Sequence, residues 1–431
     1  MLSGLKKRAL LAVAFGFCLS LHGGANAQNP AEAFSVAPPS ELVTRPLDGV
    51  PSNPSPAVSP PNPAPAQQDS AQPPAKPLPE PVTPAAVIPG RVRMALLLPM
   101  RSATLGRAAH AVRAGFLAAH EREPQGVEVT LIETGDAADA VLGGYRRASA
   151  AHDIVVGPLT RSGVTALARS GEVMRPTIAL TTPDFAEGGN VPMPGLMLAV
   201  GLSIEDEARQ VAQWAARNQA GNTAYVVHTP VTWQRRAARA FAERWKAGGM
   251  PVQLVELPLT SGFLNANALQ ALRTRLDGTG SAFLFAALDA GQARQLRESV
   301  GRQFPLYGTS QLNPVALPDR ATAEPLPEME GAFLVDLPWQ LQPDHPAVAA
   351  YPRMPVEDEQ RRSADLERLY ALGIDAYRVA RELAAQHTRF ELDGVTGRLQ
   401  VRFDRSGPQF QRTVTQAVYR DGLAVPEDGT P

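Results

Sequence analysis

From residue 91 onward, the chain alternates short apolar runs with longer segments of helical periodicity. Val92–Leu98 is apolar almost throughout, whereas Leu105–Arg122 places its apolar residues at the spacing of one helical face. The pattern predicts strands at Val92–Leu98, Val127–Ile132, Ile154–Val156 and Thr177–Leu180, and helices at Leu105–Arg122, Ala137–Ala151 and Val164–Val173. Short apolar strands separated by helices are typical of a parallel sheet that is covered on both faces.

The alternation restarts near Gly201 with a second block of similar size. Ser203 is a typical N-cap residue, and Asp206 stands at the capping-box position. The pattern predicts helices from Ser203 to about Asn218 and at Gln234–Ala247, Leu269–Leu276 and Ala290–Gly301, with strands at Ala224–His228, Val252–Leu257, Ala282–Ala286 and Leu306–Gly308. The two blocks therefore predict two doubly wound α/β lobes that are joined by a hinge.

The C-terminal part no longer follows the alternation of strands and helices. Pro-rich connections at 310–330 and 338–362 precede a long amphipathic helix at Leu366–His387. Arg398–Phe403 alternates as a strand, and we expect it to form a hairpin with Thr413–Tyr419. A late helix followed by a hairpin predicts that the chain crosses back between the lobes. We expect the first lobe to span about 91–200 and 334–388, and the second about 201–333 and 389–425.

The first 27 residues have the order of charges of a secretory signal peptide. Lys6, Lys7 and Arg8 precede a short apolar core, and Ala25-Asn26-Ala27 is a small-x-small cleavage site. We therefore expect export to a periplasm and cleavage after Ala27. The single cysteine, Cys18, follows Phe17, a poor lipidation context, so we do not expect an outer-membrane lipid anchor.

Residues 28–90 form a Pro/Ala-rich segment that we expect to be disordered. Eighteen of the 41 prolines lie between residues 30 and 90, with a single aromatic residue, Phe34. Such a sequence buries too little apolar surface to offset the entropy of ordering it. It is either a passive linker or a spacer that spans part of the cell envelope.

The composition and the motifs exclude several classes of function. The chain has 431 residues and a net charge of −1, which gives no sign of nucleic-acid binding, and no long apolar run predicts a transmembrane segment in the mature chain. No dinucleotide or phosphate-loop motif, nucleophile elbow or paired-histidine metal motif occurs. The acidic run Glu205-Asp206-Glu207 is best explained by the dipole of its helix. We therefore expect no catalysis, no cofactor and no metal.

What remains is a binding site at the carboxyl ends of the strands, where open α/β sheets bind their ligands. Hydroxyl groups and helix N–H groups at that edge suit a small polar ligand or a carboxylate. The candidates in the first lobe are Arg101, Ser102, Gly157, Leu159, Thr160, Ser162, Thr181 and Thr182, and those in the second lobe are Trp233 and Asp289. Two alternatives stay open, because Thr160 or Ser162 could cap a helix, and Trp233 could pack in the core.

Several segments resemble a known family. VRMALLLPM, VRAGFLAAH and IVVGPLTRSGVTALA resemble the type I periplasmic-binding-protein fold, a bilobed architecture. LYALGIDAYRVARELA, followed by FELDGVTGRLQVRFDRSG and RTVTQAVYRDG, resembles the LppC/LpoA family, whose members activate class A penicillin-binding proteins. The resemblance covers about residues 91–425. Family members also carry an N-terminal helical-repeat domain, which has no counterpart in the Pro-rich segment.

Two functions follow from these observations. The resemblance implies a non-enzymatic regulator of peptidoglycan synthesis that contacts a class A penicillin-binding protein. The strand-end hydroxyl groups favour instead a solute-binding protein of an ABC importer, which would bind an amino acid or a similar ligand. The split Thr160-Arg161-Ser162 triplet is a weak match to the adjacent hydroxyl pair expected of such a protein.

Overall fold

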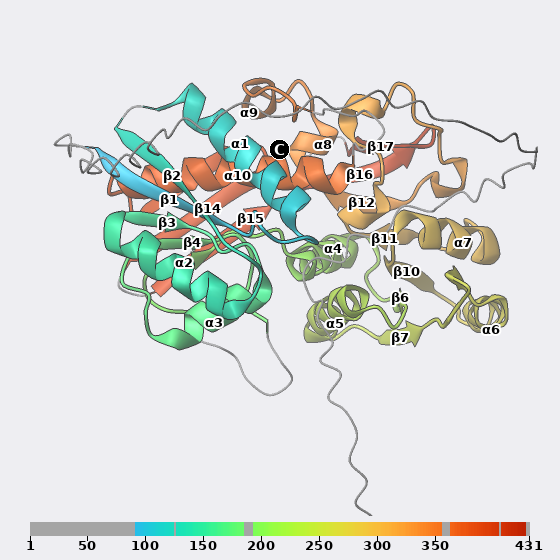
Figure 1. Cartoon of the computed structure of the whole chain (residues 1–431). Helices are drawn as coiled ribbons and strands as arrows, with labels where there is room; N and C mark the ends of the chain where they lie inside the picture. The colour runs from blue at the N-terminus through green and yellow to red at the C-terminus, as the bar shows by residue number, and fades with distance from the viewer. Residues whose placement is uncertain (1–90, 125, 185–192, 356–362, 405–406, 428–431) are drawn as a thin grey trace, which may run out of the picture. The chain divides into compact units, whose positions relative to one another are not determined.

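The computed structural model describes residues 91–124, 126–184, 193–355, 363–404 and 407–427. The predicted signal peptide, its cleavage site, Cys18 and the Pro-rich segment lie outside these residues. Within them the fold is a mixed α/β fold with parallel sheets, as predicted (Figure 1). None of the helices described is long and apolar enough to cross a membrane.

The first lobe is built on a five-stranded parallel sheet of order β2-β1-β3-β4-β5. Its strands are β1 (Val92–Leu98), β2 (Val127–Glu133), β3 (Ile154–Val156), β4 (Thr177–Ala179) and β5 (Met197–Ala199). Its helices are α1 (Gly106–Arg122), α2 (Ala138–Ala151), α3 (Arg161–Ser170) and the late helix α10 (Ala364–Ala384). Strands β1, β3 and β4 are buried on both faces over most of their length, which explains their continuous apolar sequences, whereas the edge strand β2 is partly exposed.

The second lobe is built on a seven-stranded sheet of order β17-β16-β12-β11-β10-β6-β7. Its strands are β6 (Thr223–His228), β7 (Val252–Glu256), β10 (Ala282–Ala287), β11 (Leu306–Gly308), β12 (Phe333–Asp336), β16 (Thr415–Arg420) and β17 (Leu423–Pro426). The helices are α4 (Ile204–Asn218), α5 (Thr232–Ala247), α6 (Ala266–Asp277) and α7 (Ala290–Val300). Strands β6, β7, β10, β11 and β12 run parallel, whereas β16 and β17 are antiparallel.

Smaller elements lie in the connections. The β8–β9 hairpin (Leu259–Thr260 and Phe263–Leu264) precedes α6, and the short helices η1 (Ser310–Leu312), η2 (Leu317–Asp319) and η3 (Pro327–Met329) fill the Pro-rich segment before β12. After β12 come α8 (Pro338–Leu341) and α9 (Pro346–Ala349).

The predicted C-terminal hairpin is wrong in its partner. The strand β14 (Gly397–Asp404) pairs with β13 (Arg389–Gly394) and with β15 (Gly407–Thr413), and the three form a separate antiparallel sheet. The segment Thr413–Tyr419, which was expected to pair with β14, instead lies largely in β16 beside β12. The sequence of β15, GPQFQRT, exposes every second residue and so carries too few apolar residues to be recognised as a strand.

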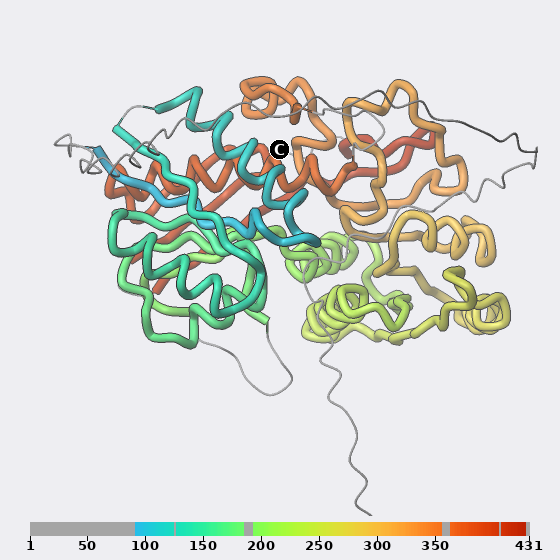
Figure 2. Tube along the Cα trace, viewed as in Figure 1, coloured from blue at the N-terminus to red at the C-terminus, as the bar shows by residue number. Residues whose placement is uncertain are grey.

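The lobe boundaries also differ from those predicted. Strand β12 hydrogen-bonds to β11 and β16, so Phe333–Asp336 belongs to the second sheet, although residues from 334 onward were expected in the first lobe. Of the range 389–425, only β16 and β17 join the second sheet, whereas β15 contacts β5 of the first. The trace in Figure 2 shows how the red C-terminal segment runs along both sheets.

Two glycines allow α1 and α10 to pack with their backbones in contact. A Cβ atom at Gly115 would lie 1.9 Å from the carbonyl oxygen of Tyr370, and one at Gly373 would lie 2.1 Å from that of Val112. No side chain fits at either position. Gly373 is the glycine of the ALGIDAY segment, so helix packing explains it.

The buried apolar side chains are continuous between the lobes. The cluster that contains Leu96 and Phe116 in the first lobe also contains Val200 and Val211, and it extends to Phe241 and Phe283 in the second lobe. Residues 200–203 link β5 to α4. We call these residues, together with Thr413–Thr415, which link β15 to β16, the waist.

Candidate functional site

At the strand ends of the first lobe the chain turns sharply at Gly157. This residue has a φ of 121° and precedes Pro158 through a cis peptide bond. A Cβ atom at Gly157 would lie 2.1 Å from the carbonyl oxygen of Leu97, so only glycine fits beside β1. The chain then turns into α3, with Leu159 fully buried in the core rather than on a rim.

The hydroxyl groups of Thr160 and Ser102 at these strand ends already have partners within the protein. Thr160 is the N-cap of α3 and accepts a hydrogen bond from the backbone N–H of Gly163 at 3.1 Å. Ser102 donates to Asp136 at 2.7 Å and accepts from the backbone N–H of Leu105 at 3.1 Å. Of the two alternatives for Thr160, capping is therefore the one that the geometry shows.

The remaining candidates of the first lobe differ in exposure. Ser162 and Arg101 are exposed, and the Arg101 guanidinium donates to the backbone oxygen of Glu133 at 3.3 Å. Thr181 is buried and Thr182 is partly exposed. A Cβ atom at Gly201 would lie 2.4 Å from the Cα atom of Thr181, so this strand end packs directly against the waist.

The strand ends of the second lobe are closed by a chain of buried amides. Gln234 accepts from the hydroxyl of Thr229 at 2.8 Å and donates to Gln292 at 2.7 Å. Asp289 caps α7 through a capping box with Gln292. The candidate Asp289 is thus a helix cap. The candidate Trp233 lies on the first turn of α5, where it is partly exposed rather than buried in the core.

An ion-pair cluster, which the sequence did not predict, connects α3 of the first lobe to α4 and α5 of the second. Arg161 Nη2 lies 3.2 and 3.3 Å from the two carboxylate oxygens of Glu205, and Arg236 Nε lies 2.9 Å from Oε1. Ser203 adds a contact of 3.3 Å to Oε2. Burial alone would raise the pKa of Glu205, but Arg161 and Arg236 lower it below its usual value, so the carboxylate is charged at neutral pH.

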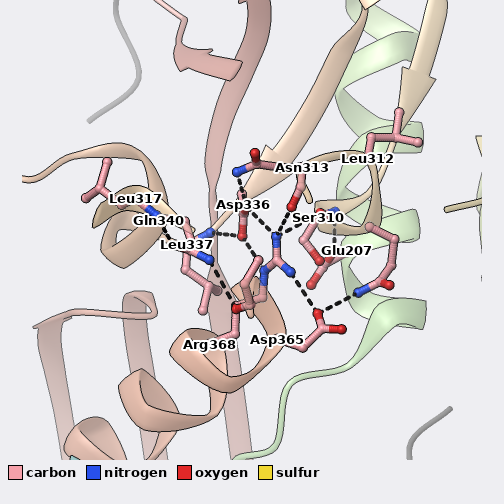
Figure 3. A network of polar contacts seen from close by, with 12 residues as sticks. Glu207, Ser310, Leu312, Asn313, Leu317, Asp336, Leu337, Gln340, Asp365 and Arg368 are labelled. Carbon is pink, nitrogen blue, oxygen red and sulfur yellow. Dashed lines mark hydrogen bonds and ion pairs between the residues drawn. The ribbon is translucent and has the colours of Figure 1, made fainter. Parts of the chain in front are cut away.

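A second polar network joins α10 to the second lobe (Figure 3). Arg368 of α10 donates to Asp336 at the end of β12, at 3.0 and 2.8 Å, and to the backbone oxygens of Ser310 and Asn313. Burial lowers the pKa of this guanidinium, but Asp336 more than offsets it and keeps Arg368 charged. Glu207 of α4 lies beside this network and accepts from the backbone N–H of Ser310 at 2.9 Å.

The two segments that carry the family resemblance meet in a third network. Asp375 of ALGIDAY accepts hydrogen bonds from the backbone N–H groups of Val395 and Thr396, and from the Thr396 hydroxyl at 2.6 Å. Thr396 in turn accepts from Arg412 at 3.0 Å. Arg412 donates to the carbonyl oxygens of Gly201 and Val200, each at 2.7 Å. Burial lowers the pKa of Arg412 to about 10, so it is charged at neutral pH.

Gln210 ties α4 to the link between β15 and β16. Its side chain donates to the backbone oxygen of Arg412 at 3.0 Å and accepts from the backbone N–H of Val414 at 3.1 Å. The residues of the ALGIDAY and GVTGRL segments therefore brace the waist, and this structural role accounts for their spacing.

Two pockets of the structure lie away from the residues that were predicted to bind a ligand. One, of about 460 Å³, lies in the second lobe beside α7 and η3, with Arg294, Arg302 and Asp421 in its wall. The other, of about 20 Å³, lies at the waist beside Asp206, Gln210 and Arg412, and has room for one water molecule. None of the ten ligand candidates lines either pocket. Among the residues described, no group of histidine, cysteine or acidic side chains is arranged to hold a metal ion.

Comparison with known proteins gives the family. The family model described as "LppC putative lipoprotein" matches residues 73–260 and 264–422. The chain belongs to the LppC family. This membership places it among exported or periplasmic proteins. No curated protein matches the chain.

Solved structures of LppC-like and transporter proteins share the fold. The C-domain of LpoA (YraM) from Haemophilus influenzae, entitled "a regulator of PBP1A", is 19% identical with a TM-score of 0.59 and covers 78% of this chain and 99% of its own. The match to full-length Haemophilus influenzae LpoA covers 78% of this chain but only 59% of LpoA, at 20% identity and a TM-score of 0.59. The LppC-family chain therefore spans less than two thirds of that relative.

The solved structure of a transporter protein is more similar in sequence to this chain than the LpoA structures are. A protein from Chromobacterium violaceum, entitled "putative branched-chain amino acid ABC transporter", is 33% identical with a TM-score of 0.60, and covers 76% of this chain and 100% of its own. The LppC-family chain is thus similar both to a regulator and to a transporter protein.

The acidic triplet Glu205-Asp206-Glu207 is a partial signal of the networks that were not predicted from the sequence. Consecutive residues on a helix point about 100° apart, so Glu205, Asp206 and Glu207 cannot all face the same surroundings. Asp206 is exposed and pairs with Arg209 on its own helix, whereas Glu205 and Glu207 are directed to other elements. An acidic triplet in one turn is therefore a reason to look for buried cations elsewhere in the chain.

Proposed function

We propose that the protein is a non-enzymatic, exported regulator of peptidoglycan synthesis that activates a class A penicillin-binding protein by direct contact. The observation that carries this proposal is the match of the LppC family model over most of the residues from 73 to 422. The LpoA C-domain, a regulator by its title, has the same fold over 99% of its length, which supports the proposal.

The networks of the site support a role without catalysis. The polar side chains of the three networks pair with one another or with backbone groups: Arg161 with Glu205, Arg368 with Asp336, and Asp375 with Thr396. A catalytic acid, base or nucleophile would have to face a bound substrate. These side chains hold elements together, so the protein offers its partner a surface rather than a reaction centre.

The second candidate is a solute-binding protein of an ABC importer, and the 33% identity to the Chromobacterium violaceum protein favours it. In that case a small polar ligand would contact the candidates that remain exposed or partly exposed, which are Arg101, Ser162, Thr182, Trp233 and Asp289. The internal hydrogen bonds of Ser102, Thr160 and Asp289 weigh against this function, because a ligand would have to replace them.

Direct binding separates the two functions. The protein, purified from the periplasmic fraction, is immobilised and exposed to a purified class A penicillin-binding protein of the same organism, and a monofunctional transpeptidase serves as the control. We expect saturable binding to the class A enzyme alone. Thermal-shift measurements with amino acids should show no stabilisation. Absence of binding together with a shift for one amino acid would establish the importer function instead.

Export and processing are part of the same proposal. We infer that the signal peptide is removed after Ala27 and that the mature protein carries no lipid, because Phe17 precedes Cys18. The intact mass of the protein isolated from cells tests this inference. A mass that matches a diacylated chain beginning at Cys18 would contradict it.

A further inference from the structure

We propose that Arg161 and Arg236 form a carboxylate-binding site between the two lobes, and that the protein's own Glu205 occupies it as a built-in ligand. The proposal concerns this chain alone and does not rest on the identity of the partner.

The cations of the site come from different lobes. Arg161 is the first residue of α3, which covers the first sheet, whereas Arg236 lies on α5, which packs against β6 and β10 of the second sheet. Their guanidinium groups meet at one carboxylate, with Arg161 contacting both of its oxygens and Arg236 contacting Oε1. Two guanidinium groups with a hydroxyl beside them form a strong recognition site for a carboxylate.

The site is shielded from solvent. The side chains of Arg161 and Glu205 are 12% and 17% exposed, and that of Arg236 is 31% exposed. Exposed ion pairs contribute little to stability, whereas removal of one member of a buried pair leaves an uncompensated charge. The neighbouring pair of Arg235 on α5 and Glu256 on β7 is different. Both of its side chains are about half exposed, and both belong to the second lobe.

The site lies where a bound solute would bridge the two lobes. Arg161 follows Thr160 at the carboxyl end of β3, which is where parallel sheets bind anions and where the sequence predicted a ligand. Periplasmic binding proteins close their lobes around a solute that bridges them. In this chain Glu205 already bridges α3 to α5, and the apolar cluster is continuous through Val200. The lobes are thus held without a solute.

Chemical rescue tests the proposal. Replacement of Glu205 by alanine leaves both guanidinium groups and opens a space of the size of a small carboxylate. We expect Glu205→Ala to lower the melting temperature by about 5–10 °C in sodium chloride, and sodium formate at the same ionic strength to restore at least half of that loss. The wild-type protein should melt at the same temperature in both salts.

Matched variants make the result specific. Glu256→Ala removes the neighbouring exposed pair and should show a small loss that formate does not restore. The double variant Arg161→Ala with Glu205→Ala should no longer respond to formate. Isothermal titration should detect formate binding to Glu205→Ala at millimolar affinity and none to the wild type.

Three results would overturn the proposal. They are formate binding of equal strength to the wild type and Glu205→Ala, an equal response of Glu256→Ala, and no response of Glu205→Ala to formate. If Glu205→Ala does not fold in chloride, its refolding in formate, followed by circular dichroism, is the measurement. Failure to refold in either salt would likewise contradict a site that accepts an external carboxylate. All of these outcomes are independent of binding to a penicillin-binding protein.

Discussion

Among single residues, Glu207 is an acid that folding brings into an unfavourable environment. It is 7% exposed, and its carboxylate faces Asp336 across the network of Figure 3. Burial raises the pKa of Glu207 from 4.5 to about 7, with a further contribution from Asp336. The folded state therefore binds a proton at Glu207 more tightly than the unfolded state does.

This difference predicts a pH-dependent stability. The stabilising contribution of protonated Glu207 is fully present below pH 4.5 and is lost as the pH rises through about 7. The variant Glu207→Gln keeps an acceptor for the N–H of Ser310 but cannot ionise. We expect it to unfold at nearly the same urea concentration as the wild type near pH 4, and to be more stable by up to about 3 kcal/mol at pH 8.

The control for this prediction is an exposed acid. Arg235 lowers the pKa of Glu256, so Glu256→Gln should give no gain at pH 8. A difference between Glu207→Gln and the wild type that stays constant from pH 5 to pH 8 would show that Glu207 does not titrate in this range.

At the scale of elements, the contact between α1 and α10 depends on glycines. Alanine is the better helix former by about 1 kcal/mol, but at Gly373 its Cβ atom would overlap the carbonyl oxygen of Val112. We expect Gly373→Ala to lower the free energy of unfolding by about 1–3 kcal/mol, because the helices must separate.

A glycine with free space around it is the matched control. At Gly143 in α2, the nearest atom to a Cβ would be 3.8 Å away, at the end of the Arg147 side chain. Gly143→Ala should therefore stabilise the protein by about 0.5–1 kcal/mol in the same urea titration. Equal effects of the two substitutions would disprove the close helix contact.

The joint between α10 and the β13–β14 turn depends on Asp375. Its side chain is 2% exposed and is the acceptor for two backbone N–H groups and the Thr396 hydroxyl. Asp375→Ala leaves these donors buried without an acceptor, which should cost about 3–5 kcal/mol in a urea titration. Asp393 on β13 is 68% exposed, and Asp393→Ala should cost less than about 0.5 kcal/mol. A cost for Asp375→Ala as small as that for Asp393→Ala would contradict the bracing role.

Helices, strands and helix caps could be predicted where they depend only on residues that are adjacent in the sequence. The Ser203 cap and the strands β3 and β11 follow from a few adjacent positions, and the structure confirms them. The partner of β14 was not predictable, because β15 is half polar and β16 is the more apolar strand. The partner of Glu205 was not predictable either, since Arg161 and Arg236 approach it only after both sheets have formed.

For the molecule as a whole, the three polar networks have a common effect. Glu205 links α3 to α5, Arg368 links α10 to β12, and Arg412 links β15 to the carbonyl oxygens of residues 200 and 201. Each link joins elements that are distant in sequence, and together they restrain the movement of one sheet relative to the other. A regulator that acts by contact benefits from such a waist, because its binding surface is formed before the partner arrives.

The central claim is that this LppC-family protein acts on a synthase through its surface and needs no small ligand. The most direct measurement is the rate of glycan-strand polymerisation by a purified class A penicillin-binding protein of the same organism, with increasing amounts of the dialysed protein. We predict a rate that rises and saturates near one molecule of protein per synthase, without added solute. An unchanged rate at every ratio, or a rise that requires an added amino acid, would contradict the claim.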